Sequence, residues 1–122
     1  MEGVDMRAYI AERMGLTKQL NTASKPPKLM YLDEYPMWKT RFYNYVIGYD
    51  ASLWIAIEED FELPKDENGE IVKVISKMTK PQRDRFEREK KMFNQLLQGI
   101  GNEVQHQFRQ FKTSRSLWYA LR

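Results

Sequence analysis

Residues that could do chemistry are sparse in this 122-residue sequence, which holds a single histidine and no cysteine. His106 lies in the segment EVQHQFRQF between two glutamines. A catalytic or metal-binding histidine needs a partner that holds it, and the sequence offers neither a second histidine nor a thiolate. Phosphate-binding glycine loops, nucleophile elbows and dinucleotide fingerprints are also missing from the sequence. We therefore assign His106 no role, and we expect no catalytic residue, no metal, no cofactor and no small-molecule substrate.

Carboxylates crowd into the segment EEDFE at 58–62, and the segment DENGE at 66–70 has the composition of a calcium loop. A calcium loop that began at Asp66 would need a glutamate as its twelfth residue, and the sequence has Lys77 there. We interpret the acidic cluster as a solvated helix end and loop rather than as a divalent metal site. The protein is accordingly not predicted to be an enzyme.

The segment KMTKPQRDRFEREKK at 77–91 carries seven basic side chains that could contact phosphates. Asp84, Glu87 and Glu89 are interleaved at helical spacing, so that many of these charges could pair with neighbours. The interleaving favours a salt-bridged outer face over a dedicated nucleic-acid surface. The residues that would contact RNA or another copy of the chain are Arg83, Arg85, Arg88 and Lys91.

Charge is segregated along the chain although the net charge is only +3. Residues 34–70 contain three basic and nine acidic side chains (−6), whereas residues 71–122 contain twelve basic and four acidic ones (+8). This distribution suits nucleic acid at the basic end, or a contact between the acidic part of one copy and the basic part of another. No apolar run approaches the roughly 18 residues of a membrane span, and the first residues lack the order of a signal peptide. We expect a cytoplasmic protein without a membrane partner.

Two linked helices are predicted after residue 35, because aromatic residues recur every three or four positions. Pro36 is tolerated in the first turn, Gly48 is placed to end the first helix, and Asp50 is a predicted N-cap for the second. We interpret the repeating apolar residues as a core rather than as a cofactor pocket or a platform for stacked bases. They are Trp38, Phe42, Tyr45, Val46, Tyr49, Leu53, Trp54 and Ile57.

The second half of the sequence predicts a small hairpin or irregular loop at 61–75 and then three helices. Asn68-Gly69 is a turn signal, and Thr79 with Gln82 forms a capping box that opens a helix over 80–98. Asn102 and Thr113 are predicted to cap two further helices. The inward residues of the three helices are predicted to be Phe86, Phe93, Leu96, Leu97, Ile100, Val104, Phe108, Phe111, Leu117, Trp118 and Leu121.

The first residues are predicted to form a separate unit. Met6, Ile10 and Met14 recur every four positions, which indicates a short amphipathic helix, and a linker that closes with Pro26 and Pro27 follows. We expect these three residues to be assembly contacts through which the helix docks on a neighbouring copy. We therefore divide the chain into residues 1–28, the helix and linker, and residues 29–122, an all-α compact bundle of about five helices. The pattern of the last helix breaks off at the end of the sequence, so we expect the natural lobe to continue.

Three segments in register resemble the opening of Gag polyproteins from copia-type plant LTR retrotransposons. The first is KPPKLMYLDEYPMWKTRFYNYVIGYDASLWIAIEEDFELP, the second is MTKPQRDRFEREKKMFNQLLQGIGNEVQHQF, and the third is FKTSRSLWYAL. The first carries W-K-x-R-F, D-x-x-L-W-x-x-I and an acidic stretch that ends in proline. The third matches T-[AS]-x-x-[LI]-W-x-x-L. The resemblance covers about Pro26 to Leu121.

The resemblance implies the N-terminal lobe of a capsid region, a structural protein that self-assembles into the virus-like particle shell of a retrotransposon. The matching core positions are Trp38, Phe42, Leu53, Trp54, Leu117 and Trp118. Family members carry a C-terminal zinc knuckle for RNA that is missing here, so RNA contacts would belong to other parts of the full-length protein. Two alternatives stay open: an RNA-binding module that uses the basic 77–91 segment, and a host-captured, Gag-derived adaptor domain.

Overall fold

The computed structural model describes residues 25–121, and its regular secondary structure in that range is helical. The longer helices are α1 (Tyr35–Asp50) and α3 (Lys80–Gln98), followed by the short helices α4 (Asn102–Gln107) and α5 (Ser114–Ala120). A one-turn helix, α2 (Ile55–Glu58), and three 3-10 turns complete the elements: η1 (Leu32–Glu34), η2 (Ala51–Trp54) and η3 (Ile75–Lys77). The predicted all-α class is confirmed. The helix predicted around Met6, Ile10 and Met14 lies outside the described residues.

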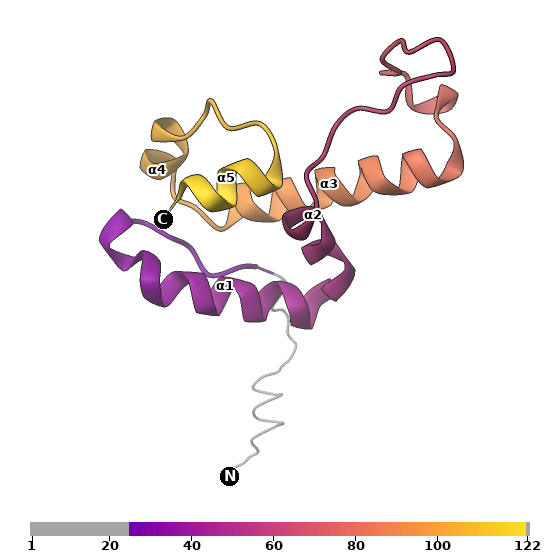
Figure 1. Cartoon of the computed structure of the whole chain (residues 1–122). Helices are drawn as coiled ribbons and strands as arrows, with labels where there is room; N and C mark the ends of the chain where they lie inside the picture. Colours follow the sequence, from indigo (N-terminus) through magenta and orange to yellow (C-terminus); the bar gives the residue numbers. More distant parts are fainter. Residues whose placement is uncertain (1–24, 122) are drawn as a thin grey trace.

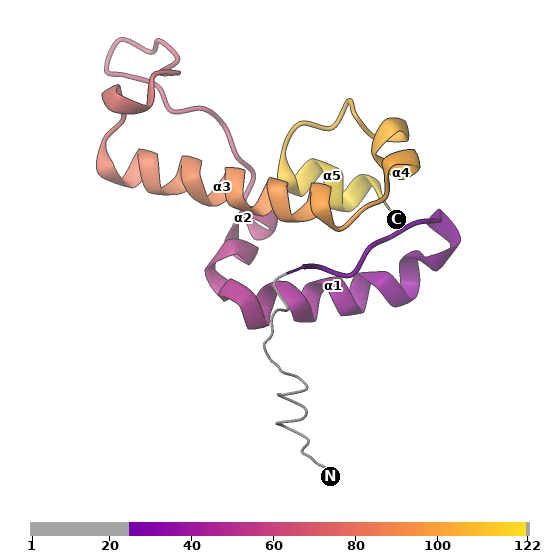
Figure 2. The same cartoon turned by 180° about the vertical axis from the view of Figure 1, so that it is seen from behind.

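The helices form two layers, with α1 in one layer and α3, α4 and α5 in the other (Figures 1 and 2). At one end of α1 the chain turns through η2 and α2 into the second layer, where η2 packs against α1 and α3, and α2 packs against α3 and α5. From α2 the chain leaves the body as a long irregular excursion and returns at the start of α3.

The segment before α1 runs along the body and closes one edge of the core. Leu29 is fully buried and forms a parallel bridge with Ile100. The Leu29 backbone N–H donates to the Gly99 carbonyl at 2.8 Å, and the Gly101 N–H donates to the Leu29 carbonyl at 2.7 Å. The Trp38 Nε1–H donates to the carbonyl of Pro27 at 2.9 Å. The packed region therefore includes the Pro-Pro pair that the sequence suggests as the end of a linker.

Three helix starts follow local hydrogen-bond chemistry, as predicted. The capping box at Thr79 is present, with Gln82 N–H donating to Thr79 Oγ1 at 3.3 Å and Thr79 N–H donating to Gln82 Oε1 at 2.9 Å, and α3 spans the predicted 80–98. Thr113 caps α5 in the same way, with Ser116 as its partner. Asp50 caps the turn that follows α1 by accepting from the Ser52 N–H at 3.1 Å.

Two predicted helix signals are wrong. Gly48 does not end α1: it keeps a helical backbone, and the helix runs two residues further to Asp50, whose extended backbone makes the break. Asn102 does not cap α4, since the cap position is occupied by Gly101 and no side chain bonds to the free N–H groups there. In both cases the chain breaks where a neighbouring residue adopts an extended conformation.

The predicted hairpin is present as a tight turn held by a single bridge between Lys65 and Ile71. Asp66 organises the turn, because its Oδ1 accepts from the N–H groups of Asn68 and Glu70, both at 2.9 Å. Gly69 has a φ of 81°, a left-handed conformation that glycine adopts without steric cost. The turn signal is thus correct, but residues 25–121 contain no strand beside it.

The core lies between the two layers. Of the predicted core residues, Trp38, Phe42, Leu53, Ile57, Leu117 and Trp118 are buried, while Tyr45, Trp54, Phe93, Leu97 and Phe108 are half-buried against them.

Tyr49 and Phe86 depart from the predicted core. The Tyr49 side chain is 55% exposed and stacks on Tyr45 at the surface. Its neighbours on α3 are Lys91, Asn94 and Gln95, so no apolar layer covers it. Phe86 is half-buried and packs against Phe61, outside the main cluster.

Candidate interaction surfaces

The aromatic stripes of α1 and α5 pack against each other and leave no aromatic pocket between them. The centroid of the Trp118 ring lies 5.7 Å from that of Trp38, 5.8 Å from that of Phe42 and 4.9 Å from that of Trp54, the last in an edge-to-face arrangement. Trp38 and Trp118 expose 4% and 5% of their surface. A base or cofactor ring could not stack on them without opening the core, so the place to look for interactions is the outer surface.

The joint between α3 and α5 contains a buried carboxyl group that the sequence analysis assigned to the outer face. Glu89 is 2% exposed, and its Oε2 accepts from the Ser114 N–H at 2.9 Å. The Ser114 hydroxyl donates back to the Glu89 carbonyl at 3.3 Å. Burial raises the pKa of Glu89, and the bonds from Ser114 oppose this shift. Glu89 was missed because an acidic residue in a charged run usually indicates solvent, although its spacing from Met92 and Leu96 fits the inward face.

The second oxygen of Glu89, Oε1, makes no hydrogen bond. Glu89 is also one of the residues that line a small cavity. The cavity holds about 10 Å³ and is also lined by Ala56, Phe61, Arg85 and Arg88. This space matches one water molecule, which is how buried polar groups are commonly satisfied. Glu59 also lines the cavity, together with the two arginines, but no nucleophile does. Because both contacts of Glu89 go to Ser114, we interpret Glu89 as a clamp that fixes the first turn of α5 on α3.

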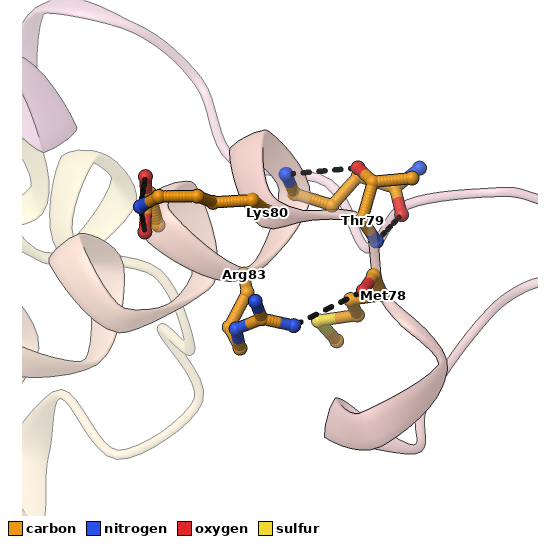
Figure 3. Close-up of polar contacts among 6 residues, drawn as sticks. Met78, Thr79, Lys80 and Arg83 are labelled. Atoms are coloured by element: carbon orange, nitrogen blue, oxygen red, sulfur yellow. Dashed lines mark hydrogen bonds and ion pairs between the residues drawn. The ribbon is translucent and has the colours of Figure 1, made fainter.

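The basic start of α3 is less paired than the sequence analysis predicted (Figure 3). Lys80 and Asp84 form the one ion pair found in residues 25–121, at 3.0 Å. Arg83 donates to the carbonyl of Met78 at 3.2 Å, and Arg85 donates to the carbonyl of Asp60. The prediction of a salt-bridged outer face is therefore wrong in the part of the chain that the structure describes. The reason is that two of the arginines bond to backbone carbonyls rather than to carboxylates.

The four residues predicted to contact RNA or another copy do not lie on one face. Successive helix residues are about 100° apart, so Arg83 and Arg85 point in nearly opposite directions. Arg88 is half-buried beside the Glu89 cavity, and it also lines a second depression together with the exposed Lys91. Arg83 and Arg85 instead hold the two ends of the excursion between α2 and α3.

That excursion, residues 59–77, is called the arm below. It projects from the end of the body where α3 begins (Figure 1). Six acidic and three basic residues give it a net charge of −3. Ile71, Val74 and Ile75 expose 53%, 54% and 49% of their surface on it. Three exposed aliphatic side chains within five residues make the arm a candidate contact segment.

At the other end of α3, a hollow of about 160 Å³ opens between α3, α4 and α5. It is called the groove below. Phe93, Phe108 and Phe111 line it and are half-buried, while Arg109 and Lys112 are exposed at its rim. Gln105 fixes this end of the fold, because its Nε2 donates to the Leu97 carbonyl at 2.6 Å and to the Ile100 carbonyl at 3.0 Å.

A third surface surrounds the start of α1. Met30, Tyr31 and Met37 are 48%, 68% and 64% exposed there. Met37 lines a shallow depression of about 510 Å³ together with Asp33, Glu34 and Arg41. This surface mixes both signs of charge around its apolar residues, unlike the basic rim of the groove.

Comparisons with protein-family models, with curated proteins and with solved structures give no match to this chain. Within residues 25–121, no helix has the length and apolar character needed to cross a membrane. The same residues contain no group of three or more histidine, aspartate or glutamate side chains placed to hold a metal ion. The sequence motifs and the three surfaces therefore remain as the indications of function.

Proposed function

We propose that this chain is a structural self-association module, the N-terminal capsid-type lobe of a Gag polyprotein whose copies build a cytoplasmic particle shell. The resemblance of three motifs in register to copia-type Gag proteins supports this proposal. The helical fold agrees with it, because the tryptophan-bearing motifs supply buried residues such as Trp38 and Trp118. A shell subunit needs no reacting group, only a rigid body with surfaces that other copies can bind.

One observation carries the proposal: the arm and the groove are unlike surfaces at opposite ends of α3. The arm projects where α3 begins (Figures 1 and 2), and the groove lies beside Phe93 and Leu97 near the end of the same helix. The arm is acidic and exposes aliphatic side chains, whereas the groove is aromatic with a basic rim. Contacts between unlike surfaces join copies head to tail, and repetition of such a contact closes a ring or extends a lattice. Single exposed apolar residues are common on monomers, but two clustered sets at opposite ends favour association.

The test is the mass of the purified chain as a function of concentration and salt. Sedimentation velocity and light scattering should give a mass above the monomer that grows with protein concentration. The mass should fall between low salt and about 1 M salt, where the screening length is roughly 3 Å. Negative-stain electron microscopy of longer chains that contain this lobe should show particles. A monomer mass at every concentration would exclude the proposal.

An RNA-binding module is the second candidate, because much of the basic charge near α3 is unpaired in the described part of the chain. Lys77 and Lys91 are exposed and form no ion pair within residues 25–121. This candidate predicts that fluorescence anisotropy detects single-stranded RNA binding whose affinity falls steeply with salt. Exchange of Lys77 and Lys91 for glutamine should weaken the binding. Lys39→Gln, at an exposed position of α1, is the control and should change it little. Binding that ignores both changes would exclude it.

A further inference from the structure

We propose that the arm of one copy docks in the groove of the next copy, with an aliphatic side chain of the arm among the groove phenylalanines. This inference rests on the proposed self-association and names the two surfaces that carry it. It commits to a second copy of this chain as the occupant of the groove. Three features of the molecule support the pairing: apolar fit, opposite charge, and a separation that prevents contact within one copy.

The apolar parts of the two surfaces match in size and kind. Val74 and Ile75 are adjacent and about half exposed, and they lie where the arm turns back toward α3. Phe93, Phe108 and Phe111 leave a hollow of about 160 Å³. A buried apolar cavity of about 150 Å³ accommodates a benzene molecule, so this hollow has room for a branched aliphatic side chain. Docking would cover exposed apolar surface on both partners.

The two surfaces have opposite net charges, although the charged residues next to Val74 and Ile75 themselves are Lys73 and Lys77. The arm has a net charge of −3, with Asp66, Glu67 and Glu70 clustered at its tip. Arg109 and Lys112 at the groove rim are exposed and have no ion-pair partner within residues 25–121. Opposite charges at the rim of an interface speed association and fix its register. The same charges would disfavour arm-to-arm or groove-to-groove contacts.

The fold keeps the arm of one copy away from the groove of the same copy. The arm joins α3 at Lys80, and the groove residues Phe93 and Leu97 lie 13 and 17 residues later on the same helix. At 1.5 Å per residue these separations are about 20 Å and 26 Å. The arm also points away from α4 and α5 in both views (Figures 1 and 2). An arm-in-groove contact therefore joins different copies, head to tail.

The test uses two variants of the full 122-residue chain, each with one broken surface. Val74→Asp with Ile75→Asp breaks the arm, and Arg109→Glu with Lys112→Glu breaks the groove rim. All four residues are exposed, so circular dichroism should show the wild-type helix content. The matched controls are Tyr31→Asp with Met37→Asp, an apolar-to-acid change on the third surface, and Lys39→Glu with Arg41→Glu, a charge reversal on exposed α1.

Each broken variant alone should need at least tenfold more protein to associate in sedimentation velocity, and the controls should match the wild type. A mixture of the two broken variants is the decisive experiment. The groove-broken chain keeps an intact arm and the arm-broken chain keeps an intact groove, so the mixture should form a 1:1 pair that grows no further. No symmetric pairing through a single surface predicts this complementation.

The possible failures are distinguishable. If the broken variants associate as the wild type does, the arm-in-groove contact is wrong while self-association stands. If association is lost in the Tyr31 and Met37 control instead, the third surface carries it. If deletion of residues 1–24 alone abolishes association, a segment before the described residues occupies the interface. If the wild type is a monomer throughout, this inference and the proposed function both fail.

Discussion

Aromatic residues at helical spacing build two different regions of this molecule. In the core between α1 and α5, Trp38, Phe42 and Trp118 are each at most 5% exposed and pack ring against ring. Around the groove, Phe93 on α3 and Phe108 directly after α4 were predicted from the same kind of spacing, yet both stay half-buried. The difference lies in what faces them. The core between α1 and α5 receives rings from both helices, whereas the groove is bordered by the six-residue α4, the loop after it and Leu117 of α5.

The largest predicted effect is the difference in the free energy of unfolding between a substitution in the core and one in the groove. Phe42→Ala removes a fully buried ring from the core between α1 and α5 and should lower the free energy of unfolding by about 3–5 kcal/mol. Phe111→Ala removes a half-buried ring from the groove and should lower it by about 1 kcal/mol, since only part of its surface leaves water on folding. Urea unfolding followed by circular dichroism measures both values. Tyr49→Ala, at an exposed ring, should stay within about 0.5 kcal/mol of the wild type.

Equal losses for Phe42→Ala and Phe111→Ala would contradict the comparison. That result would mean that the groove is closed in solution by another part of the chain. The groove would then be part of the core rather than an open surface.

A second prediction tests how tightly the core is packed, by substituting alanine for one glycine beside the core and for one exposed glycine. A Cβ atom on Gly99 would lie 2.6 Å from Phe42 Cε1, a ring that is fully buried and cannot move aside freely. Gly99→Ala should therefore lower the free energy of unfolding by about 1–3 kcal/mol. Gly48 lies at an exposed position of α1, and a Cβ atom there would have no neighbour within 4 Å. Gly48→Ala should raise the free energy by about 0.5–1 kcal/mol, because alanine loses less backbone freedom in a helix.

Thermal unfolding of the two glycine variants should thus give shifts of opposite sign. Two shifts of the same sign would show that the contact between Gly99 and Phe42 relaxes at little cost.

The same two regions show what the sequence could and could not predict. The bounds of α3 and the caps at Thr79, Asp50 and Thr113 were predictable, because a cap is a hydrogen bond between residues two or three apart. The inward positions of Trp38 and Trp118 were predictable from periodicity. Periodicity tells which residues share a face of a helix, but it does not tell whether another element covers that face.

The features that sequence reasoning missed all depend on distant partners. Glu89 is buried because Ser114, 25 residues later, donates to it. Leu29 is buried because it pairs with Ile100. Arg85 meets the backbone of Asp60 rather than a neighbouring carboxylate on α3. For Glu89 and Arg85 the local pattern favoured charged neighbours on the same helix, and for Leu29 it indicated no partner. In each case the tertiary contact decided the outcome.

A third prediction concerns the cap that positions α5, whose Leu117 and Trp118 are buried in the core. Thr113→Ala removes the side-chain acceptor for the Ser116 N–H and should lower the free energy of unfolding by about 1 kcal/mol. Thr40→Ala is the matched control, since Thr40 lies on the exposed face of α1 and caps nothing. It should leave stability equal or slightly raised, because alanine has the higher helix propensity. Equal losses in the two variants would contradict the role of the cap.

The smallest effect is the pH dependence that Glu89 gives to the joint between α3 and α5. Burial raises the pKa of Glu89 above its ordinary value of 4.5, so the folded state favours the protonated carboxyl more than the unfolded chain does. Stability from this group is therefore fully present below pH 4.5 and is lost as the pH rises through the raised pKa of the folded state. Asp60 adds to the rise and Lys90 opposes it.

Glu89→Gln is neutral at every pH and keeps an oxygen that can accept from the Ser114 N–H. Its urea midpoint should consequently lack the decline that the wild type shows from about pH 4.5 toward neutrality. Glu87→Gln makes the same charge change on an exposed position of α3, so it should keep the wild-type decline. If Glu89→Gln and Glu87→Gln decline alike, the slope comes from the general charge of the surface. The buried carboxyl would then be paired in solution by a group such as the water that its cavity can hold.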